Sequence, residues 1–236
     1  MNAAIITAAG KGTRLKGDIN KQFMNIYGKP ILAHTITAFQ NASKIKEIYV
    51  SVPKDYLELC QKSIIEKYSF DKVKKLIVGG SSRQESVYNA LVELPASTKL
   101  VSIHDGVRPL ITAEEIDLLI NTLMRENKRD PKIRGVIMAA PARETIKITD
   151  KNTIDKTVPR ETVWYAQTPQ IFFYKDILKA HNKARQDNFI GTDDACLVER
   201  MNWKVSIVRG RHENIKITTP LDLFLAELIM TRNVRK

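Results

Sequence analysis

The sequence is poor in cysteine and histidine and contains no long apolar run. Its two cysteines, Cys60 and Cys196, lie far apart and form no CxxC pair. With only four histidines, they cannot supply a standard zinc site. No apolar stretch approaches the roughly 18 residues that a membrane helix needs, and no basic segment followed by a long apolar one opens the chain. These absences exclude a disulfide scaffold, a zinc finger and a membrane protein, and they predict a reduced, cytoplasmic compartment.

The sequence also has fewer acidic than basic residues. The chain carries 38 lysines and arginines against 26 aspartates and glutamates, a formal net charge of +12. Such an excess predicts a polyanionic partner. Nucleic acid, a nucleoside triphosphate and a sugar phosphate all qualify, so charge alone leaves the partner open. The 236 residues, 43% of them hydrophobic, can form a sizeable core. We expect one domain over residues 1–236, with two small domains as the alternative.

Short apolar runs alternate with helical patterns along most of the chain. The predicted buried strands are 3–8, 48–52, 75–78, 100–104 and 135–140. The predicted helices begin at Pro30, at Asp55 (running to 68), at Ser81 or Ser82, at a capping box on Thr112, at Asp176 and at Pro220. This repetition predicts an α/β fold with a doubly wound, mostly parallel sheet, in which ligands bind at the carboxyl ends of the strands.

The regularity ends after Pro141. Residues 145–149 alternate between apolar and polar, a turn signal follows, and residues 153–158 alternate again, which predicts a β-hairpin. A hairpin that projects from a parallel sheet cannot bury both of its faces unaided, and a partner subunit is the natural cover. We therefore predict that residues 141–166 form a β-arm for dimerisation.

A glycine-containing loop, AAGKGTR over residues 8–14, follows the first predicted strand. It is not a Walker loop, and Leu15 stands where a dinucleotide fingerprint has its third glycine. Small residues there would let backbone N–H groups approach a phosphate chain, and Lys11, Arg14 and Lys21 could supply charge. A tight turn with solvated lysines explains the same pattern, so the loop alone leaves both interpretations open.

An acid and a base follow the predicted strand over 100–104. Asp105 and Arg108 stand here in the run HDGVRP. They could be a magnesium-binding carboxylate beside an anion-binding arginine. The alternative is an Asp–Arg pair that closes a turn, and His104 is expected to be a structural histidine. The residue types alone do not choose between a site and a turn.

Two later segments add candidates. In GTDDA, residues 191–195, Thr192 is expected to cap a helix whose dipole favours the two aspartates. A capping hydroxyl can also face a ligand phosphate. In NIKIT, residues 214–218, the alternation predicts a strand in which Lys216 points away from two core isoleucines. Lys216 is then either an ordinary edge residue or an electrophile in a basic cleft.

Together these segments resemble the signature of the cytidylyltransferases. The matching runs keep the family's order: TAAGKGTR from residue 7, KQF from 21, GGSSRQESV from 79, HDGVRP from 104, QTPQ from 167, TDDA from 192 and NIKIT from 214. The resemblance is most specific to the 2-C-methyl-D-erythritol 4-phosphate cytidylyltransferase family of the non-mevalonate isoprenoid pathway, and it spans residues 2–230. It implies a Rossmann-like nucleotidyltransferase sheet. It also implies transfer of CMP from CTP to 2-C-methyl-D-erythritol 4-phosphate, giving 4-diphosphocytidyl-2-C-methyl-D-erythritol and pyrophosphate.

The resemblance also implies roles for residues that match the family's motifs. The catalytic cations would be Arg14 and Lys21 on the triphosphate, and Lys216 on the reacting α-phosphate. The nucleotide-binding residues would be Ala8, Ala9, Gly10, Gly80, Ser81 and Ser86. The residues for the polyol phosphate would be Asp105, Arg108, Arg160, Thr168 and Thr192. Asp105 would also lie beside Mg²⁺, and Arg160 would come from the arm of the other subunit of a homodimer.

Alternatives differ in substrate or in class. The implied nucleophile is a phosphate monoester, which is mostly dianionic at neutral pH and needs no general base. Ribitol 5-phosphate cytidylyltransferase shares this fold and chemistry and is the nearest alternative. The QTPQ and NIKIT segments argue against assignment of the chain as a sugar-1-phosphate nucleotidyltransferase. A nucleic-acid binding protein, suggested by the +12 charge, has no RRM, KH, helix-turn-helix or zinc signature here. We expect CTP and a polyol phosphate as partners, with no nucleic acid and no membrane.

Overall fold

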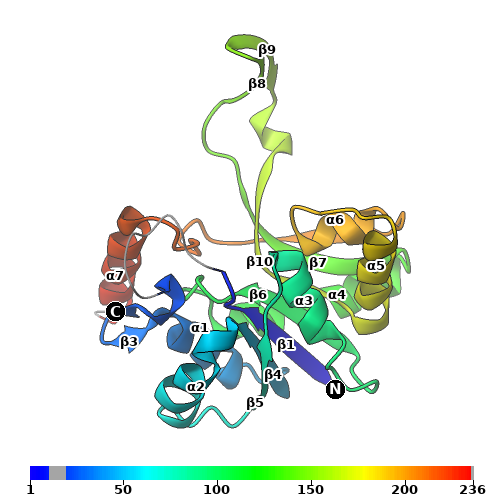
Figure 1. Ribbon diagram of the computed structural model, residues 1–236. Coiled ribbons are helices and arrows are strands. Elements are labelled where there is room, and N and C mark those ends of the chain that lie inside the picture. Colours follow the sequence, from blue (N-terminus) through cyan, green and yellow to red (C-terminus); the bar gives the residue numbers. More distant parts are fainter. Residues whose placement is uncertain (11–19, 235–236) are drawn as a thin grey trace.

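The computed structural model describes residues 1–10 and 20–234 and has a seven-stranded sheet at its centre (Figure 1). In spatial order the strands are β11 (Lys204–Arg209), β7 (Ile133–Pro141), β10 (Trp164–Phe173), β6 (Leu100–Asp105), β1 (Asn2–Thr7), β4 (Glu47–Val52) and β5 (Val73–Val78). The strand β10 runs antiparallel to β6 and β7, and the other neighbouring pairs are parallel. The mostly parallel α/β sheet predicted from the sequence is confirmed.

Helices cover both faces of this sheet. One layer contains α1 (Ile31–Asn41), α2 (Leu57–Cys60) and α4 (Ala113–Arg129), and the other contains α3 (Arg83–Leu91), α5 (Tyr174–Gln186) and α6 (Asp194–Glu199). Alternate residues of β1 enter the two cores: Ala4 and Ile6 join the first, and Ala3 and Ile5 the second. This explains the unbroken apolar run of β1, because a strand covered on both faces buries every side chain.

A third, smaller apolar cluster holds the last segment against the body of the protein. It joins α7 (Pro220–Val234) to the hairpin of β2 (Asn25–Ile26) and β3 (Lys29–Pro30), together with Val107 and Ile217. Tyr27 and Gly28 form the hairpin's turn with positive φ angles of 47° and 74°, as a two-residue hairpin turn requires. Since Ile217 is fully buried in this cluster, it fixes the backbone on which Lys216 is carried.

Several helix starts agree with the sequence patterns, and one predicted helix is divided. Thr112 and Glu115 form the expected capping box at α4, and Ser82 caps α3. The helix expected over 55–68 consists of three short pieces: the 3₁₀ turn η2 (Lys54–Tyr56), α2, and the π-helical segment η3 (Gln61–Glu66).

Two local predictions are wrong, and one strand of the central sheet was not predicted. The cap of α6 is Asp193, whose carboxylate accepts from Cys196 N at 3.0 Å, while Thr192 lies one residue further out. Residues 214–218 form no strand. Among the described residues, their only backbone–backbone bond to a distant segment runs from Ile217 N to Val107 O at 2.9 Å, and the bonds from Asn214 N to Arg211 O and from Ile215 N to Glu213 O are local. The central strand β10 contains Pro169, which cannot donate to a ladder, and the register shifts between Ala166 and Gln170 to accommodate it.

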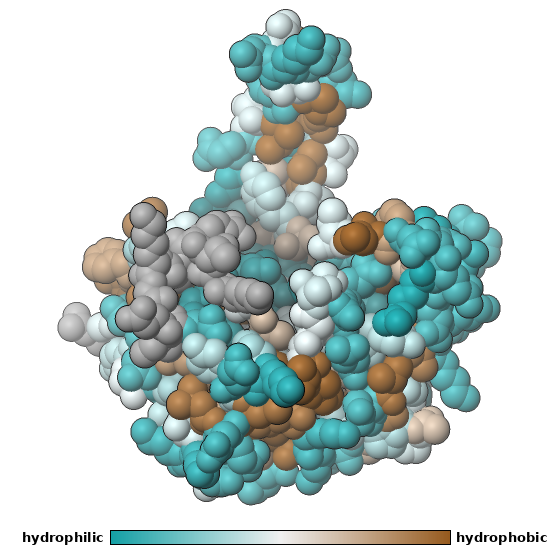
Figure 2. All heavy atoms as spheres, viewed as in Figure 1, coloured by the Kyte–Doolittle hydropathy of each residue, from teal (hydrophilic) through white to brown (hydrophobic). Residues whose placement is uncertain are grey.

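The predicted arm is a two-stranded hairpin that projects from the sheet (Figure 1). It contains β8 (Ile146–Asp150) and β9 (Thr153–Val158), with the turn η4 (Arg160–Thr162) at its base. It leaves β7 at its carboxyl end and returns as β10, so it stands at the edge of the sheet where the parallel strands end. Ile148 and Ile154 expose 43% and 59% of their surface, and Figure 2 shows apolar side chains along the arm. Over residues 1–10 and 20–234, no helix is long and apolar enough to cross a bilayer.

Candidate active site

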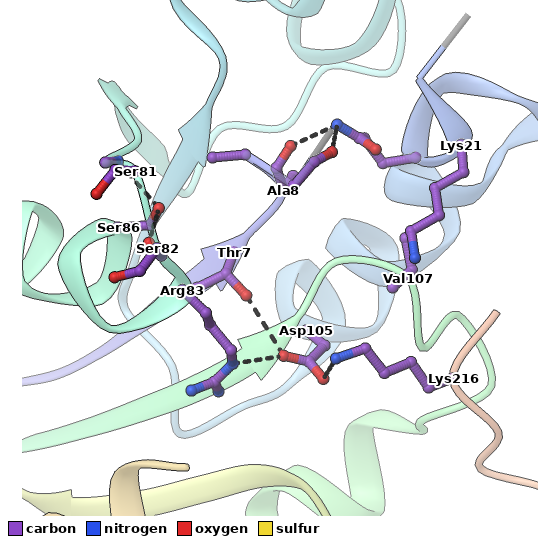
Figure 3. A pocket seen from close by; sticks show the side chains of 14 residues that line it. Thr7, Ala8, Lys21, Ser81, Ser82, Arg83, Ser86, Asp105, Val107 and Lys216 are labelled. Atoms are coloured by element: carbon purple, nitrogen blue, oxygen red, sulfur yellow. Dashed lines mark hydrogen bonds and ion pairs between the residues drawn. The ribbon is translucent and has the colours of Figure 1, made fainter. Parts of the chain in front are cut away.

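A cavity of about 450 Å³ opens at the carboxyl ends of β1 and β6, where the strand order of the sheet reverses (Figure 3). Ligands of open α/β sheets bind at such a switch point. The residues that line it are Thr7, Ala8, Ala9, Gly10, Lys21, Gln22, Gly80, Ser81, Ser82, Arg83, Ser86, Asp105, Val107 and Lys216. Nine of them are residues predicted to bind the nucleotide, to act in catalysis or to bind the second substrate: Ala8, Ala9, Gly10, Lys21, Gly80, Ser81, Ser86, Asp105 and Lys216. Arg14 lies outside the described residues.

The loop after β1 forms one wall of the cavity and is fixed by its own backbone partners. Ala8 N donates to Ser51 O at 2.7 Å. The buried amide of Gln22 donates to Ala8 O at 2.6 Å and to Gly10 O at 3.4 Å. With the carbonyl oxygens of residues 8 and 10 held by Gln22, the small side chains leave room for a ligand to approach the backbone.

The opposite wall is the turn from β5 into α3. Ser86 Oγ accepts from Gly80 N at 3.0 Å and donates to Ser82 O at 2.8 Å. Glu85 accepts from both the backbone N and the hydroxyl of Ser81, at 2.7 and 2.6 Å. A Cβ on Gly79 would stand 2.1 Å from the Cβ of Ala9. Any other residue at this position would force the two walls apart, so their close approach requires a glycine here.

Asp105, at the end of β6, is surrounded by three cations, of which Figure 3 shows Arg83 and Lys216. Its Oδ1 is 2.9 Å from Arg83 Nε, and its Oδ2 is 2.9 Å from Lys216 Nζ and 3.6 Å from Arg108 Nε. Burial alone would raise the pKa of this carboxyl, but Arg83, Lys216 and Arg108 outweigh it and hold the pKa well below its usual range. The carboxylate is therefore charged at neutral pH and fixes the ammonium of Lys216.

A second cavity of about 230 Å³ adjoins the first and shares Arg83, Asp105 and Lys216 with it. Its other lining residues are Arg108, Ala166, Gln167, Thr168, Gln170, Thr192 and Asp193. The hydroxyl of Thr168 accepts from Asp105 N at 3.1 Å. The predicted substrate residues Asp105, Arg108, Thr168 and Thr192 thus line one space, and a row of charged side chains separates it from the nucleotide wall.

Arg160 is the exception among the predicted substrate residues that the structure describes. It belongs to η4 at the base of the arm, and its side chain is 57% exposed. Its contacts are Arg143 O at 3.3 Å and the carboxylate of Glu161 at 3.7 Å. It is not among the described residues that line either cavity of its own chain.

The structure adds charged residues that the sequence-based site did not include. Arg83 NH1 pairs with Asp194 Oδ2 at 2.7 Å, and Asp194 Oδ1 lies 3.1 Å from His181 Nε2. Arg83 and Asp194 stand within the motifs GGSSRQESV and TDDA, so the motifs contained the signal. For His181 the sequence contains no such signal. Asp194 was predicted as an acid at a helix start, and the structure shows that it also pairs with Arg83.

Asp194 contributes to stability in a pH-dependent way. Burial alone would raise its pKa, but Arg83 and His181 outweigh burial and hold the pKa below its ordinary value. The unfolded chain therefore takes up the proton first, at about pH 4, so the stabilisation is complete above this pH and is lost as the pH falls toward the folded-state pKa. We expect the free energy of unfolding to decrease more steeply between about pH 5 and pH 3 in the wild type than in Asp194→Asn. Urea denaturation at stepped pH measures both slopes, and equal slopes would contradict the assignment.

Comparison with known proteins points to one family. The sequence matches the family of 2-C-methyl-D-erythritol 4-phosphate cytidylyltransferase over residues 2–232. It is 42% identical over 229 residues to the enzyme of that name from Geotalea uraniireducens, covering 96% of this chain and 95% of that protein. A second enzyme of that name, from Caldanaerobacter subterraneus, is 42% identical over 231 residues, covering 98% of this chain and 99% of that protein.

Solved structures agree with the sequence relatives. The 4-diphosphocytidyl-2C-methyl-D-erythritol synthase of Anaerococcus prevotii superposes with a TM-score of 0.84 at 34% identity, covering 98% of this chain and 96% of that one. The 2-C-methyl-D-erythritol 4-phosphate cytidylyltransferase of Francisella tularensis superposes with a TM-score of 0.78 at 31% identity, covering 96% and 98%. By fold, site and near-complete coverage, the chain belongs to the 2-C-methyl-D-erythritol 4-phosphate cytidylyltransferase family of nucleotidyltransferases.

Proposed function

We propose that this chain transfers CMP from CTP to 2-C-methyl-D-erythritol 4-phosphate, giving 4-diphosphocytidyl-2-C-methyl-D-erythritol and pyrophosphate. The observation that carries the proposal is the cluster of Asp105, Arg83 and Lys216, which stands between two adjoining cavities in a chain of this family. Two reactants that both carry phosphate would meet at this cluster. A cytoplasmic location is in keeping with the two free thiols of Cys60 and Cys196.

CTP would occupy the larger cavity. The cytosine and ribose would lie between the loop of residues 8–10 and the turn of residues 79–86, whose close approach depends on Gly79. The triphosphate would extend along Lys21 toward Lys216. The predicted nucleotide-binding residues Ala8, Ala9, Gly10, Gly80, Ser81 and Ser86 all line this cavity, which supports the assignment.

The reaction needs charge screening more than a general base. An oxygen of the methylerythritol phosphate attacks the α-phosphorus of CTP, and the bond from that phosphorus to the bridging oxygen breaks as pyrophosphate leaves. The attacking phosphate is mostly dianionic at neutral pH because its second pKa is about 6. Lys216, at the boundary of the two cavities, would reach the reacting phosphate from a position that Asp105 fixes in advance. Fixed cations aimed at the charge of the transition state supply most of the catalysis in phosphoryl transfer.

Binding of a divalent cation stays a prediction, and the oxygen donors of the larger cavity are compatible with it. Over the described part of the chain, no three His, Cys, Asp or Glu side chains gather as a ready-made metal site. Mg²⁺ usually takes one or two carboxylates together with the phosphates of its substrate. Asp105 is the carboxylate among the described residues of the larger cavity, so it would lie beside an ion held mainly by the triphosphate. When bound, Mg²⁺ neutralises charge on the triphosphate.

We also propose a homodimer in which the arm brings Arg160 to the second cavity of the partner. Arg160 is exposed on its own chain and is not among the described residues that line either cavity. The arm's apolar residues Ile148 and Ile154 are exposed as well, and an isolated two-stranded hairpin with an uncovered apolar side is at best marginally stable. A second copy of the chain would cover these side chains and complete the site.

The substrate assignment is tested by measuring pyrophosphate release from CTP and Mg²⁺, with methylerythritol 4-phosphate and ribitol 5-phosphate tested side by side. We expect release with methylerythritol phosphate alone, and loss of release when Mg²⁺ is removed by a chelator. Release with ribitol phosphate alone would keep the fold and the CTP site but overturn the substrate. No release with either would overturn the proposed reaction.

A further inference from the structure

We propose that His181 and Asp194 act through Arg83 as a buried relay that positions Asp105 and Lys216 for the transfer reaction. The relay extends from α5 through α6 and α3 to the end of β6. The inference rests on the proposed function, because it takes the cluster around Asp105 to be the reacting site. His181 and Asp194 are positioning residues in this scheme, since neither touches the reactants.

The relay is an unbroken series of short polar contacts. His181 Nε2 lies 3.1 Å from Asp194 Oδ1, and Asp194 Oδ2 accepts from Arg83 NH1 at 2.7 Å. Arg83 Nε then donates to Asp105 Oδ1 at 2.9 Å, and Lys216 pairs with Asp105 Oδ2 at 2.9 Å. The side chains of His181 and Asp194 are 0% and 1% exposed, so water does not compete for these contacts.

Asp194 decides how Arg83 meets Asp105. A guanidinium prefers to bind a carboxylate through two parallel hydrogen bonds. In this structure Arg83 is shared instead: NH1 goes to Asp194 and Nε to a single oxygen of Asp105. The other oxygen of Asp105 is left for Lys216 at 2.9 Å, with Arg108 Nε further away at 3.6 Å. Without Asp194, Arg83 can turn both nitrogens to Asp105 and displace Lys216, so the charge of Asp194 keeps the lysine in place.

His181 in turn orients Asp194. Because Asp194 is ionised, His181 Nε2 carries the proton of that contact and donates to Oδ1. This leaves Oδ2 directed at Arg83. A buried group that holds the orientation of an active-site residue commonly matters almost as much as the residue itself, and changing one costs about 10-fold to 100-fold at metal sites. We expect a similar scale here, with the loss in turnover greater than the change in substrate affinity.

The test is a double-variant cycle measured by steady-state kinetics. We expect Asp194→Asn to lower kcat by about 10-fold or more, with smaller changes in the KM for CTP and for the polyol phosphate. We expect Arg83→Gln to lower kcat as well, and Asp194→Asn to add almost nothing in the Arg83→Gln background. If the losses of kcat in the two single variants multiply in the double variant, Asp194 does not act through Arg83 and the relay is overturned. Unchanged kcat in Arg83→Gln would instead count against the proposed reacting site.

Two further variants keep the test decisive if Asp194→Asn folds poorly. His181→Phe removes the donor to Asp194 and should lower kcat, whereas His181→Gln keeps a donor and should recover most of it. The matched control is Tyr174→Phe, which removes a buried hydroxyl bonded to Leu91 O at 3.1 Å at the start of the same helix. This control should lower the melting temperature and leave kcat unchanged. A loss of kcat in Tyr174→Phe equal to that in His181→Phe would overturn the relay in favour of a general packing effect.

Discussion

Replacing Lys216 by alanine is expected to lower kcat by about 10²-fold or more, the scale on which removal of one transition-state donor acts. The ammonium lines both cavities and is fixed 2.9 Å from Asp105 Oδ2. Its charge is thus in place before the phosphates arrive, and alanine offers nothing at that point when negative charge builds up on the α-phosphate. We expect the same scale of loss for Lys21→Ala, because Lys21 lines the larger cavity beside the proposed triphosphate.

Single-turnover and steady-state rates of pyrophosphate release measure this effect. The matched control is Lys204→Ala on β11. Lys204 also pairs with a carboxylate, at 2.7 Å from Asp130, but its pair lies at the start of its strand, away from the cavity. We expect the control to keep its activity. Near-normal turnover in both Lys216→Ala and Lys21→Ala would refute their assignment as catalytic cations.

Arg160→Ala is expected to remove most activity from the homodimer, and mixing is expected to restore part of it. Each proposed site combines the Lys216 of one chain with the Arg160 of the other. Lys216→Ala and Arg160→Ala chains should therefore both be nearly inactive alone. In a two-fold dimer assembled from an equal mixture, half of the dimers are mixed and each has one complete site, so about a quarter of the wild-type rate should return.

The experiment mixes the unfolded variants in equal amounts, refolds them together and follows pyrophosphate release. Refolding either variant alone is the control for recovery of the fold. Dilution of the wild type below its dimerisation range should abolish activity in parallel. If mixing restores nothing while both variants refold as dimers, Arg160 does not act across the interface.

The sequence predicted where the buried strands end. It also predicted that the residues just after them lie close together at one edge of the sheet. Asp105 and Gly80 come directly after predicted strands, and parallel strands end at the same edge of a sheet. The structure places both in one cavity. The start of α4 was equally readable, because Thr112 and Glu115 satisfy each other's backbone locally.

The pairing of Arg83 with Asp194 was not predictable in the same way. The two residues lie on separate helices, α3 and α6, whose relative rotation is decided by how each packs on the sheet. Nothing in the spacing of 111 residues between them encodes that rotation. Similarly, the alternation around Lys216 indicated a strand, but an extended segment that buries Ile217 gives the same pattern without a ladder. A local sequence pattern predicts which side chains are buried. It does not predict which residues those side chains contact.

The place of β10 in the sheet constrains how the chain can be assembled on the ribosome. The only neighbours of β7 in the described sheet are β10 and β11, and both are synthesised after it. While residues 142–163 emerge, which takes on the order of one to four seconds, β7 has no strand to pair with and β6 has an open edge. Open edges of this kind are templates for pairing with other chains. The arm therefore sets a delay during which the nascent chain is most exposed to aggregation, and the emergence of residues 164–173 ends that delay by closing the sheet.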